Sequence, residues 1–402
     1  MIRIIKAPFA SLAFVALGVL LLNGGPVTVQ TADDFFDGQV LQRIDLLINS
    51  DDWRTLQADT GTRAYHPATL KWGDIVARNI GVRSEGGGGR DERKPRLRVD
   101  ASWYVSGGTF LGLPSLMLDN LSEDASGVRR TVTLRFYQWM DLPAPRAVHA
   151  ALYVNNAFAG VYTVIEPVDH AVARYVRGNG QDRGRLYRYT SAVPYRLNYL
   201  GTDLSRYRDL FQVEPEQPLF ASDDYAAIEE MIRTLNSNVG APDERRLAKY
   251  VDLRQFMKIA AVQNFLGVSG GIAGRDGMSD FSLEVRRRTD AVQFLPNGEL
   301  TGLVDPRYPI EQGLAGNVVA RQARQIEALF QSYVDTLRAS ADIADKRDRN
   351  RPAGSGPALQ AEVDREQRLI NEAIRADSLK RWTDREFTDA SAAVSGFARD
   401  RA

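Results

Sequence analysis

The spacing of apolar residues changes about half-way along the chain, and this change constrains the fold more than any other feature. In the first half, short runs such as 113–118, 147–154 and 160–165 read as strands, and Asn155-Asn156 lies between the last two as in a hairpin. In the second half, apolar residues recur every three or four positions, which is the period of a helix packed against a core. The sequence therefore predicts an α+β protein.

Two segments interrupt this division and help to define the expected architecture. Residues 128–140 have helical spacing within the first half, and the strand-like runs 281–285 and 300–304 form a small hairpin within the second. This is the layout of a two-lobed protein, and the cleft between two lobes is a common ligand site. We expect a strand-rich N-terminal lobe over 35–215, a helical C-terminal lobe over 216–330, and a linker and helices over 331–402 that complete the second lobe.

A glycine-rich turn follows the apolar helix that ends near Asn264, and acidic residues follow the turn. The glycines are Gly267, Gly270, Gly271, Gly274 and Gly277, and the acids are Asp276, Asp280 and Asp305. Glycine permits backbone conformations that a Cβ forbids. Acids in loops at the ends of strands are placed where metal and phosphate chemistry is usually done. The alternative, which composition alone favours, is a surface hairpin after a helix.

Composition excludes several kinds of chemistry. The chain of 402 residues has no cysteine, which excludes disulfides, thiolate catalysis and cysteine metal sites. Its three histidines are far apart in the sequence, which argues against a histidine-built zinc site. Lysine plus arginine equals aspartate plus glutamate, 51 against 51, so there is no net field to attract nucleic acid. We therefore expect no nucleic-acid partner.

The first 32 residues have the pattern of a targeting segment. Arg3 and Lys6 precede an apolar run over residues 7–22, and small residues follow. The run is short for a helix that spans a membrane. We expect a secretory signal, with an uncleaved membrane anchor as the alternative. In either case the rest of the chain is predicted to be extracytoplasmic, and it would touch a membrane only through this segment.

Five blocks, in the right order and at the right spacing, resemble the CotH family of spore-coat kinase-like proteins over roughly Val40 to Arg401. The matched residues are Gly81 to Gly86 with Lys94; Leu118, Asn120, Asp124, Ser126 and Arg129; Ala144, Pro145, Leu152, Asn155, Gly160, Tyr162, Glu166 and Asp169; Gly184, Leu186, Tyr187 and Arg188; and Ile370, Ala373, Asp377, Phe387, Phe397 and Arg401. The resemblance implies an atypical protein-kinase-like fold, similar to ordinary kinases in core architecture, with its kinase-like domain over residues 35–330.

The resemblance also implies where a nucleotide would bind. Phosphoryl transfer depends on positioning and charge neutralisation, so a lysine must meet the phosphates and a glutamate must orient that lysine. Lys94 and Glu166 are the candidates for these roles in binding ATP, and Arg83 is the candidate for a second cation. For Lys94 and Glu166 the alternative is a solvated position on or beside a strand.

The motif in the second half departs from the family pattern. The family has Asp-Gly, then an Asn before a strand, then Trp-Asp-x-Asp; here the first Asp falls on Gly270 and the Asn falls on Asp280. Asp305 retains the first acid of the last pair, and Arg307 replaces the second. A carboxylate can bind Mg²⁺ or Mn²⁺ as an amide can, so Asp280 and Asp305 are the predicted metal ligands. Glycine cannot accept a proton. Asp276 is the candidate to replace the lost catalytic acid, provided that the loop folds back.

Two functions from different classes are therefore predicted. The first is a secreted kinase-like enzyme that uses ATP with Mg²⁺ or Mn²⁺ to phosphorylate serine or threonine in a protein substrate. The second is a catalytically degenerate relative, a pseudokinase, that binds a protein partner or has a structural role in the envelope. A third hypothesis, glycan or polymer binding, rests on the aromatic residues Trp53, Trp72, Trp103 and Tyr104, which at these spacings are more often part of a core.

Overall fold

The structure is a computed structural model that describes residues 30–58, 63–85, 93–169, 184–214, 225–237, 241–298, 301–347 and 356–402. The predicted targeting segment lies almost entirely outside these ranges, and so does most of the predicted linker over residues 346–357. Within the described ranges, no helix combines the length and the apolar character needed to cross a membrane.

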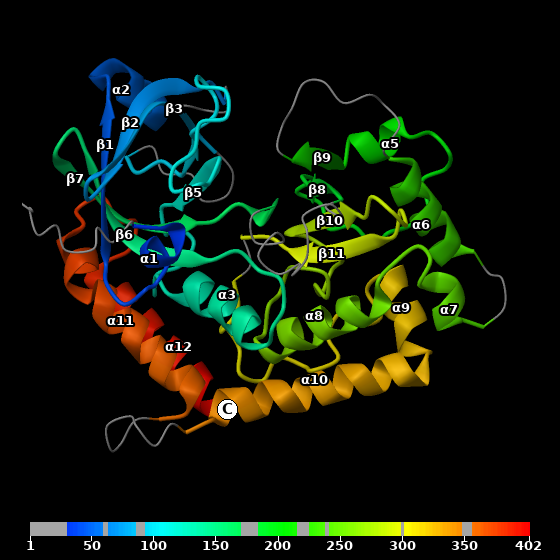
Figure 1. Cartoon of the computed structure of the whole chain (residues 1–402). Coiled ribbons are helices and arrows are strands. Elements are labelled where there is room, and N and C mark those ends of the chain that lie inside the picture. The colour runs from blue at the N-terminus through cyan, green and yellow to red at the C-terminus, as the bar shows by residue number, and fades with distance from the viewer. Residues whose placement is uncertain are drawn as a thin grey trace, which may run out of the picture.

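Strands from the first half of the chain form a closed barrel, drawn in blue to green in Figure 1. The strands are β1 (Gln42–Ile48), β2 (His66–Trp72), β3 (Ile75–Ser84), β4 (Leu97–Asp100), β5 (Ser115–Asp119), β6 (Ala147–Val154) and β7 (Ala157–Ile165), in the order β1-β2-β3-β4-β5-β7-β6. β1 pairs in parallel with β6 and so closes the barrel, whereas the other neighbouring strands are antiparallel. Alternate side chains of each strand face the interior; Ile44, Leu46 and Ile48 of β1 are buried there. The predicted β6–β7 hairpin, with its turn at Asn155-Asn156, is confirmed.

A separate four-stranded antiparallel sheet has the order β11-β10-β8-β9. Its strands are β8 (Arg185–Tyr189), β9 (Phe211–Glu214), β10 (Phe281–Val285) and β11 (Val292–Pro296). The prediction that 300–304 pairs with β10 is wrong, because the chain reverses directly after β10. The backbone N–H of Arg286 donates to the oxygen of Ala291 at 3.0 Å, which brings β11 alongside β10. Leu303 instead donates to the carbonyl oxygen of Leu266, outside the sheet.

Helices pack around this sheet and against the barrel. They are α1 (Ala32–Phe35), α2 (Ser50–Ala58), α3 (Arg129–Trp139), α5 (Ser205–Arg208), α6 (Ala226–Asn236), α7 (Glu244–Leu247), α8 (Leu253–Phe265), α9 (Val318–Arg324), α10 (Glu327–Asp345), α11 (Ala358–Ala376) and α12 (Asp384–Arg401). Figure 1 shows α10 running below α8, and α11 and α12 lying under the barrel. One hydrophobic cluster fills the barrel, and a second joins α3, the four-stranded sheet and the later helices. The predicted α+β class is confirmed.

Helix α8 carries the chain into the glycine-rich turn. Asp252 caps its start, because the carboxylate of Asp252 accepts a hydrogen bond from the N–H of Gln255 at 3.0 Å. The helix is buried on almost every side, so tertiary packing holds it in place. It ends just before Gly267, which has a φ of +65° and therefore favours glycine. The turn thus starts from a rigid element in the core.

Candidate functional site

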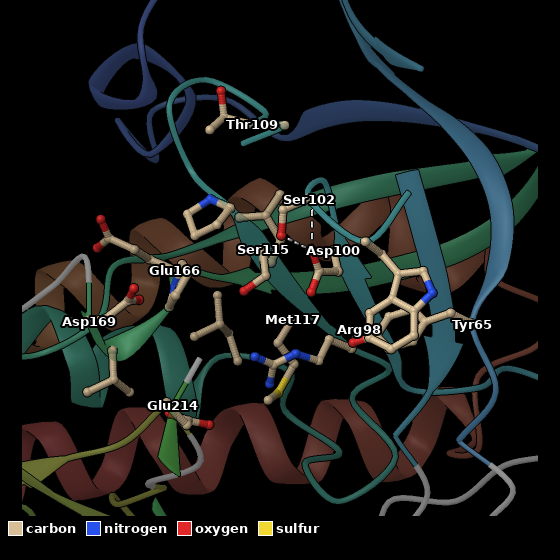
Figure 2. Close-up of a pocket in the computed structure, with 18 of the residues that line it drawn as sticks. Tyr65, Arg98, Asp100, Ser102, Thr109, Ser115, Met117, Glu166, Asp169 and Glu214 are labelled. Atoms are coloured by element: carbon tan, nitrogen blue, oxygen red, sulfur yellow. Dashed lines mark hydrogen bonds between the residues drawn. The ribbon is translucent and has the colours of Figure 1, made fainter. Parts of the chain in front are cut away.

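Two cavities lie close to the predicted site residues. The larger, about 770 Å³, lies between β4 and β5 of the barrel and the four-stranded sheet, and we call it the inter-sheet cavity (Figure 2). The smaller, about 440 Å³, is lined by residues 267–270 of the glycine-rich turn and by residues around Asp280 and Asp305, and we call it the glycine-loop cavity. Each has a volume in the range of small-molecule sites.

Paired charges from both sheets line the inter-sheet cavity. Figure 2 shows the side chain of Arg98, on β4, reaching into the cavity toward the side on which Glu214 lies. Burial opposes the charge of Arg98, but the carboxylates of Glu214 and Glu85 outweigh it and raise the pKa of Arg98. Glu214, on β9, forms an ion pair with Arg188 of β8 at 3.0 Å, yet burial raises the pKa of Glu214. The cavity therefore presents two arginines whose charges acidic residues already balance.

Aromatic rings form another part of the wall of this cavity. Tyr65 and Trp103 stack with ring centroids 4.0 Å apart, and Trp103 remains 51% exposed. Gly81 makes the stack possible, because a Cβ there would lie 2.8 Å from Cβ of Trp103 and 2.8 Å from a ring carbon of Tyr65. Tyr104 also lines the cavity, whereas Trp72 packs inside the barrel. Two of the residues on which the glycan-binding hypothesis rests, Trp103 and Tyr104, are therefore accessible. Glycan binding itself stays a prediction.

Glu166 follows β7 and lines the inter-sheet cavity, but its carboxylate is held by Arg146. The Arg146 guanidinium lies 2.8 Å from Oε1 and donates to Oε2 at 3.2 Å, and the Arg146 backbone N–H donates to Oε2 at 3.0 Å. Glu166 is only 2% exposed. The structure therefore gives Glu166 an arginine as its partner, where the sequence predicted a lysine.

Lys94 lies in a different network from Glu166, and the roles predicted for the two residues in binding ATP stay predictions. Its Nζ lies 2.7 Å from Oδ2 of Asp377 and donates to the carbonyl oxygen of Val161 at 2.8 Å. Gly160 allows this approach, because a Cβ there would lie 2.4 Å from the same carboxylate oxygen. Among the described residues, those lining the two cavities do not include Lys94. The pair ties the barrel to the end of α11.

Arg83 lies behind the aromatic wall of the inter-sheet cavity. It is 4% exposed, donates to Glu85 at 3.2 Å, and places its guanidinium 5.1 Å from the ring centre of Tyr65. Of the three predicted nucleotide-binding residues, only Glu166 is among the described residues that line this cavity. The cavity is also lined by Arg98 and Arg188, neither of which was predicted as a site residue. Arg188 is one of the residues matched to the family, whereas Arg98, on a strand of the other sheet, gives no signal in a single sequence.

The three acids that the sequence analysis singled out line one cavity. Asp276, Asp280 and Asp305 all line the glycine-loop cavity. Asp276 and Asp305 are exposed, and Asp280 is half-buried. The carboxylate of Asp305 accepts a hydrogen bond from the backbone N–H of Arg307 at 2.9 Å. Whether any of these acids binds metal or accepts a proton stays a prediction.

Arg401, near the end of α12, connects two walls of the glycine-loop cavity. Its guanidinium donates to the carbonyl oxygens of Asn264 and Phe265 at 2.7 and 2.8 Å, and to that of Pro306 at 2.9 Å. The first two carbonyls lie at the C-terminal end of α8, where carbonyls lack intrahelical partners and attract positive charge. Arg401 therefore fixes the start of the glycine-rich turn relative to the segment that carries Asp305.

Residues that line the two cavities are in contact where β11 ends. The backbone N–H of Asn297, which lines the inter-sheet cavity, donates to the carbonyl oxygen of Asp280, which lines the glycine-loop cavity, at 3.4 Å. Tyr308 also lines the glycine-loop cavity; its hydroxyl is buried and has no hydrogen-bond partner among the described residues. The sequence analysis named neither Asn297 nor Tyr308.

The carboxylates of the glycine-loop cavity suit a metal ion that binds together with the phosphates of a substrate. Among the described residues, no three acidic or histidine side chains lie close enough together to hold an ion. Mg²⁺, however, is usually bound through one or two protein carboxylates together with substrate phosphates and water. The carboxylates that line the glycine-loop cavity fit this second arrangement.

Comparisons with known proteins give a family and a distant structural likeness. The family model described as CotH kinase protein matches residues 82–285. Among solved structures, the chain is similar to one from the Shewanella oneidensis MR-1 toxin–antitoxin system HipA, HipB and its operator DNA complex, with 10% identity and a TM-score of 0.30. That alignment covers 73% of this chain and 58% of the other, so the chain spans less than two thirds of it. No curated protein matches the sequence.

Proposed function

The chain belongs to the CotH kinase protein family, and from this premise we propose that it binds ATP with Mg²⁺ and transfers phosphate to serine or threonine of a protein. The observation that carries the proposal is the contact between Asn297, which lines the inter-sheet cavity, and Asp280, which lines the glycine-loop cavity. One cavity has room for a nucleotide, and the other is lined by carboxylates. A nucleotide that reached from the first cavity to the second would bring its terminal phosphate to the acids.

In this proposal the nucleotide lies between two lobes, the barrel on one side and the four-stranded sheet with its helices on the other. The exposed face of Trp103, which Tyr65 supports, suits a nucleobase, because aromatic faces stack on planar groups. Arg98 and Arg188 supply positive charge for the phosphates and would exchange part of their pairing with acids for pairing with phosphate.

The glycine-loop cavity would receive the terminal phosphate. A bound Mg²⁺ would neutralise phosphate charge during transfer. Asp305 is exposed at the cavity and is the carboxylate best placed to hold that ion together with phosphate oxygens. Arg401 would keep Asp305 in register with the glycine-rich turn through its contact with Pro306.

A second function is favoured by one observation, the glycine at position 270. A chain that lacks an acid at this place could retain nucleotide binding without transfer, and it would then act as a pseudokinase that binds a protein of the envelope. Both functions place the chain outside the cytoplasm, a proposal that rests on the targeting pattern of the first 32 residues.

Titration calorimetry with ATP tests the proposal, with and without Mg²⁺ or Mn²⁺. We expect metal-dependent binding by the purified chain. We expect Arg98→Ala to weaken binding by about 10- to 100-fold, because one charge-assisted contact contributes roughly 1.5–3 kcal/mol. Arg78→Ala removes an exposed arginine from the same barrel and should leave the affinity unchanged. Absence of nucleotide binding under every condition would contradict both the kinase and the nucleotide-binding pseudokinase.

A further inference from the structure

The carboxylate of Asp280 occupies the space of the side chain that is missing at position 270. An ideal Cβ built on Gly270 would lie 2.8 Å from Oδ2 of Asp280 and 2.8 Å from Oγ of Ser279. Because non-bonded atoms do not normally approach a Cβ so closely, a side chain at 270 would require the side chains of Asp280 and Ser279 to shift. Resting on the proposed function, we infer that Asp280 accepts the proton of the acceptor hydroxyl, as an acid at position 270 would.

The backbone brings Asp280 back against the glycine-rich turn. The N–H of Ser279 donates to the carbonyl oxygen of Gly271 at 3.0 Å, which places residues 279 and 280 beside the start of the turn. Asp280 has a φ of +50°, a conformation that Asp and Asn adopt more readily than most side chains do. Its carbonyl oxygen is then held by Asn297. The position of Asp280 is therefore fixed from both ends.

The carboxylate itself is oriented within the cavity. Oγ of Ser279 donates to Oδ2 of Asp280 at 3.0 Å, and this is the oxygen that lies nearest to Gly270. A hydrogen bond from a neighbouring hydroxyl holds a carboxylate in one orientation, which a group that receives a proton requires. Asp280 is also the least exposed of the three acids that line the cavity.

The other two acids are placed less well for this role. Asp276 is exposed, and Arg196 donates to its backbone carbonyl, so its loop is held at the rim of the cavity. One carboxylate oxygen of Asp305 accepts the N–H of Arg307, and the side chain is exposed. We therefore infer that Asp280, in preference to the predicted Asp276, replaces the lost acid, and that Asp305 is left to hold Mg²⁺.

The buried hydroxyl of Tyr308 is a separate sign that a polar ligand enters this cavity. It has no hydrogen-bond partner among the described residues, although it is only 4% exposed. An unsatisfied buried hydroxyl costs free energy, and a phosphate or an acceptor hydroxyl in the cavity would remove that cost.

The reaction balances with ATP as the phosphate donor. The oxygen of the acceptor hydroxyl forms a bond to the γ-phosphorus, and the bond from that phosphorus to the bridging oxygen of ADP breaks. The electron pair of the broken bond leaves with ADP. The proton of the hydroxyl passes to the carboxylate of Asp280.

The variant Asp280→Asn separates proton transfer from metal binding, because an amide can bind Mg²⁺ but cannot accept the proton. With the full chain and Mg²⁺-ATP, we expect self-phosphorylation and phosphate release to fall at least about 100-fold, in line with the usual contribution of general-base catalysis. Nucleotide affinity by calorimetry should change less than about threefold. Asp290→Asn, at an exposed turn with a φ of +54°, is the matched control and should keep full activity.

A second pair of variants keeps the test decisive. Gly270→Asp alone places two carboxylates in one space and should lower the melting temperature, whereas Gly270→Asp with Asp280→Gly, which empties that space at a φ of +50°, should restore both stability and transfer. Transfer that survives in Asp280→Asn would overturn the inference, because Asp280 would then serve as a ligand that Asn can replace. A parent chain that binds Mg²⁺-ATP but transfers nothing, to itself or to water, would also overturn it and leave nucleotide binding standing. Failure of the parent to bind would instead count against the proposed function.

Discussion

Charged residues differ in burial between the base of the barrel, where they are buried and paired, and the glycine-loop cavity, where two of the three acids are exposed. In the barrel, Lys94 and Asp377 form an ion pair in which both side chains are at most 3% exposed. In the cavity, Asp276 and Asp305 are exposed. Breaking a buried pair leaves a charge without compensation, whereas losing an exposed acid costs little stability. We therefore expect substitution of the buried pair to cost stability and substitution of the exposed acids to cost little.

The largest effect should follow from breaking the buried pair with Lys94→Met. Asp377 would keep its backbone donors but lose its cation, so the free energy of unfolding should fall by about 3–5 kcal/mol. Denaturant unfolding measures this change. Lys71→Met, at an exposed lysine of β2, should change it by less than about 0.5 kcal/mol. A Lys94→Met chain that keeps its stability and loses only nucleotide affinity would show that Lys94 acts at the ligand after all.

The buried carboxylate of Glu366, on α11 beneath the barrel, should make a smaller contribution to stability that depends on pH. Burial disfavours the charge of Glu366 on α11, but His149 of β6, at 3.1 Å, and Arg365 outweigh it and hold the pKa of Glu366 below its ordinary value. Arg135 of α3 also favours the charge, and Thr131 contacts the same histidine. A depressed folded pKa means that the charged carboxylate stabilises the fold fully above about pH 4.3, and that this contribution is lost as pH falls through the folded pKa.

The measurement is the melting temperature as a function of pH. The parent chain should lose stability as pH falls below the ordinary pKa of glutamate, and Glu366→Gln should make this loss shallower. Glu372→Gln, at an exposed position of the same helix, should leave the profile of the parent unchanged. If Glu366→Gln and the parent have parallel profiles, the buried carboxylate does not contribute to the pH dependence.

The smallest effect on stability should come from Asp305→Asn in the glycine-loop cavity. Asn can still accept the N–H of Arg307, so the free energy of unfolding should change by less than about 0.5 kcal/mol. The dependence of nucleotide binding on Mg²⁺ should nevertheless weaken, because one carboxylate is lost from the proposed ion site. Calorimetry at two Mg²⁺ concentrations checks this. A large loss of stability would place Asp305 with the structural charges of the barrel.

Local patterns in the sequence predicted the elements that depend on near neighbours. Asp252 begins α8, Gly267 ends it, and Asn155-Asn156 turns the β6–β7 hairpin, because caps and tight turns depend on residues a few positions apart. The partner of β10 was missed because both β11 and residues 300–304 have the spacing of a strand, and local pattern cannot choose between them.

The sequence by itself determined the α+β class and the family, since both follow from local spacing and motifs. The tertiary structure decided that Asp305 lines the same cavity as Asp276 and Asp280, because the β10–β11 hairpin separates it from them in the chain. Only the tertiary structure decided which charges are paired. Lys94 meets Asp377 across 283 positions, and Arg98 faces Glu214 from another sheet. Such partners are selected by the closure of the barrel and by its packing against α11, and no spacing within the chain encodes either. The same long-range packing placed the carboxylate of Asp280 against Gly270.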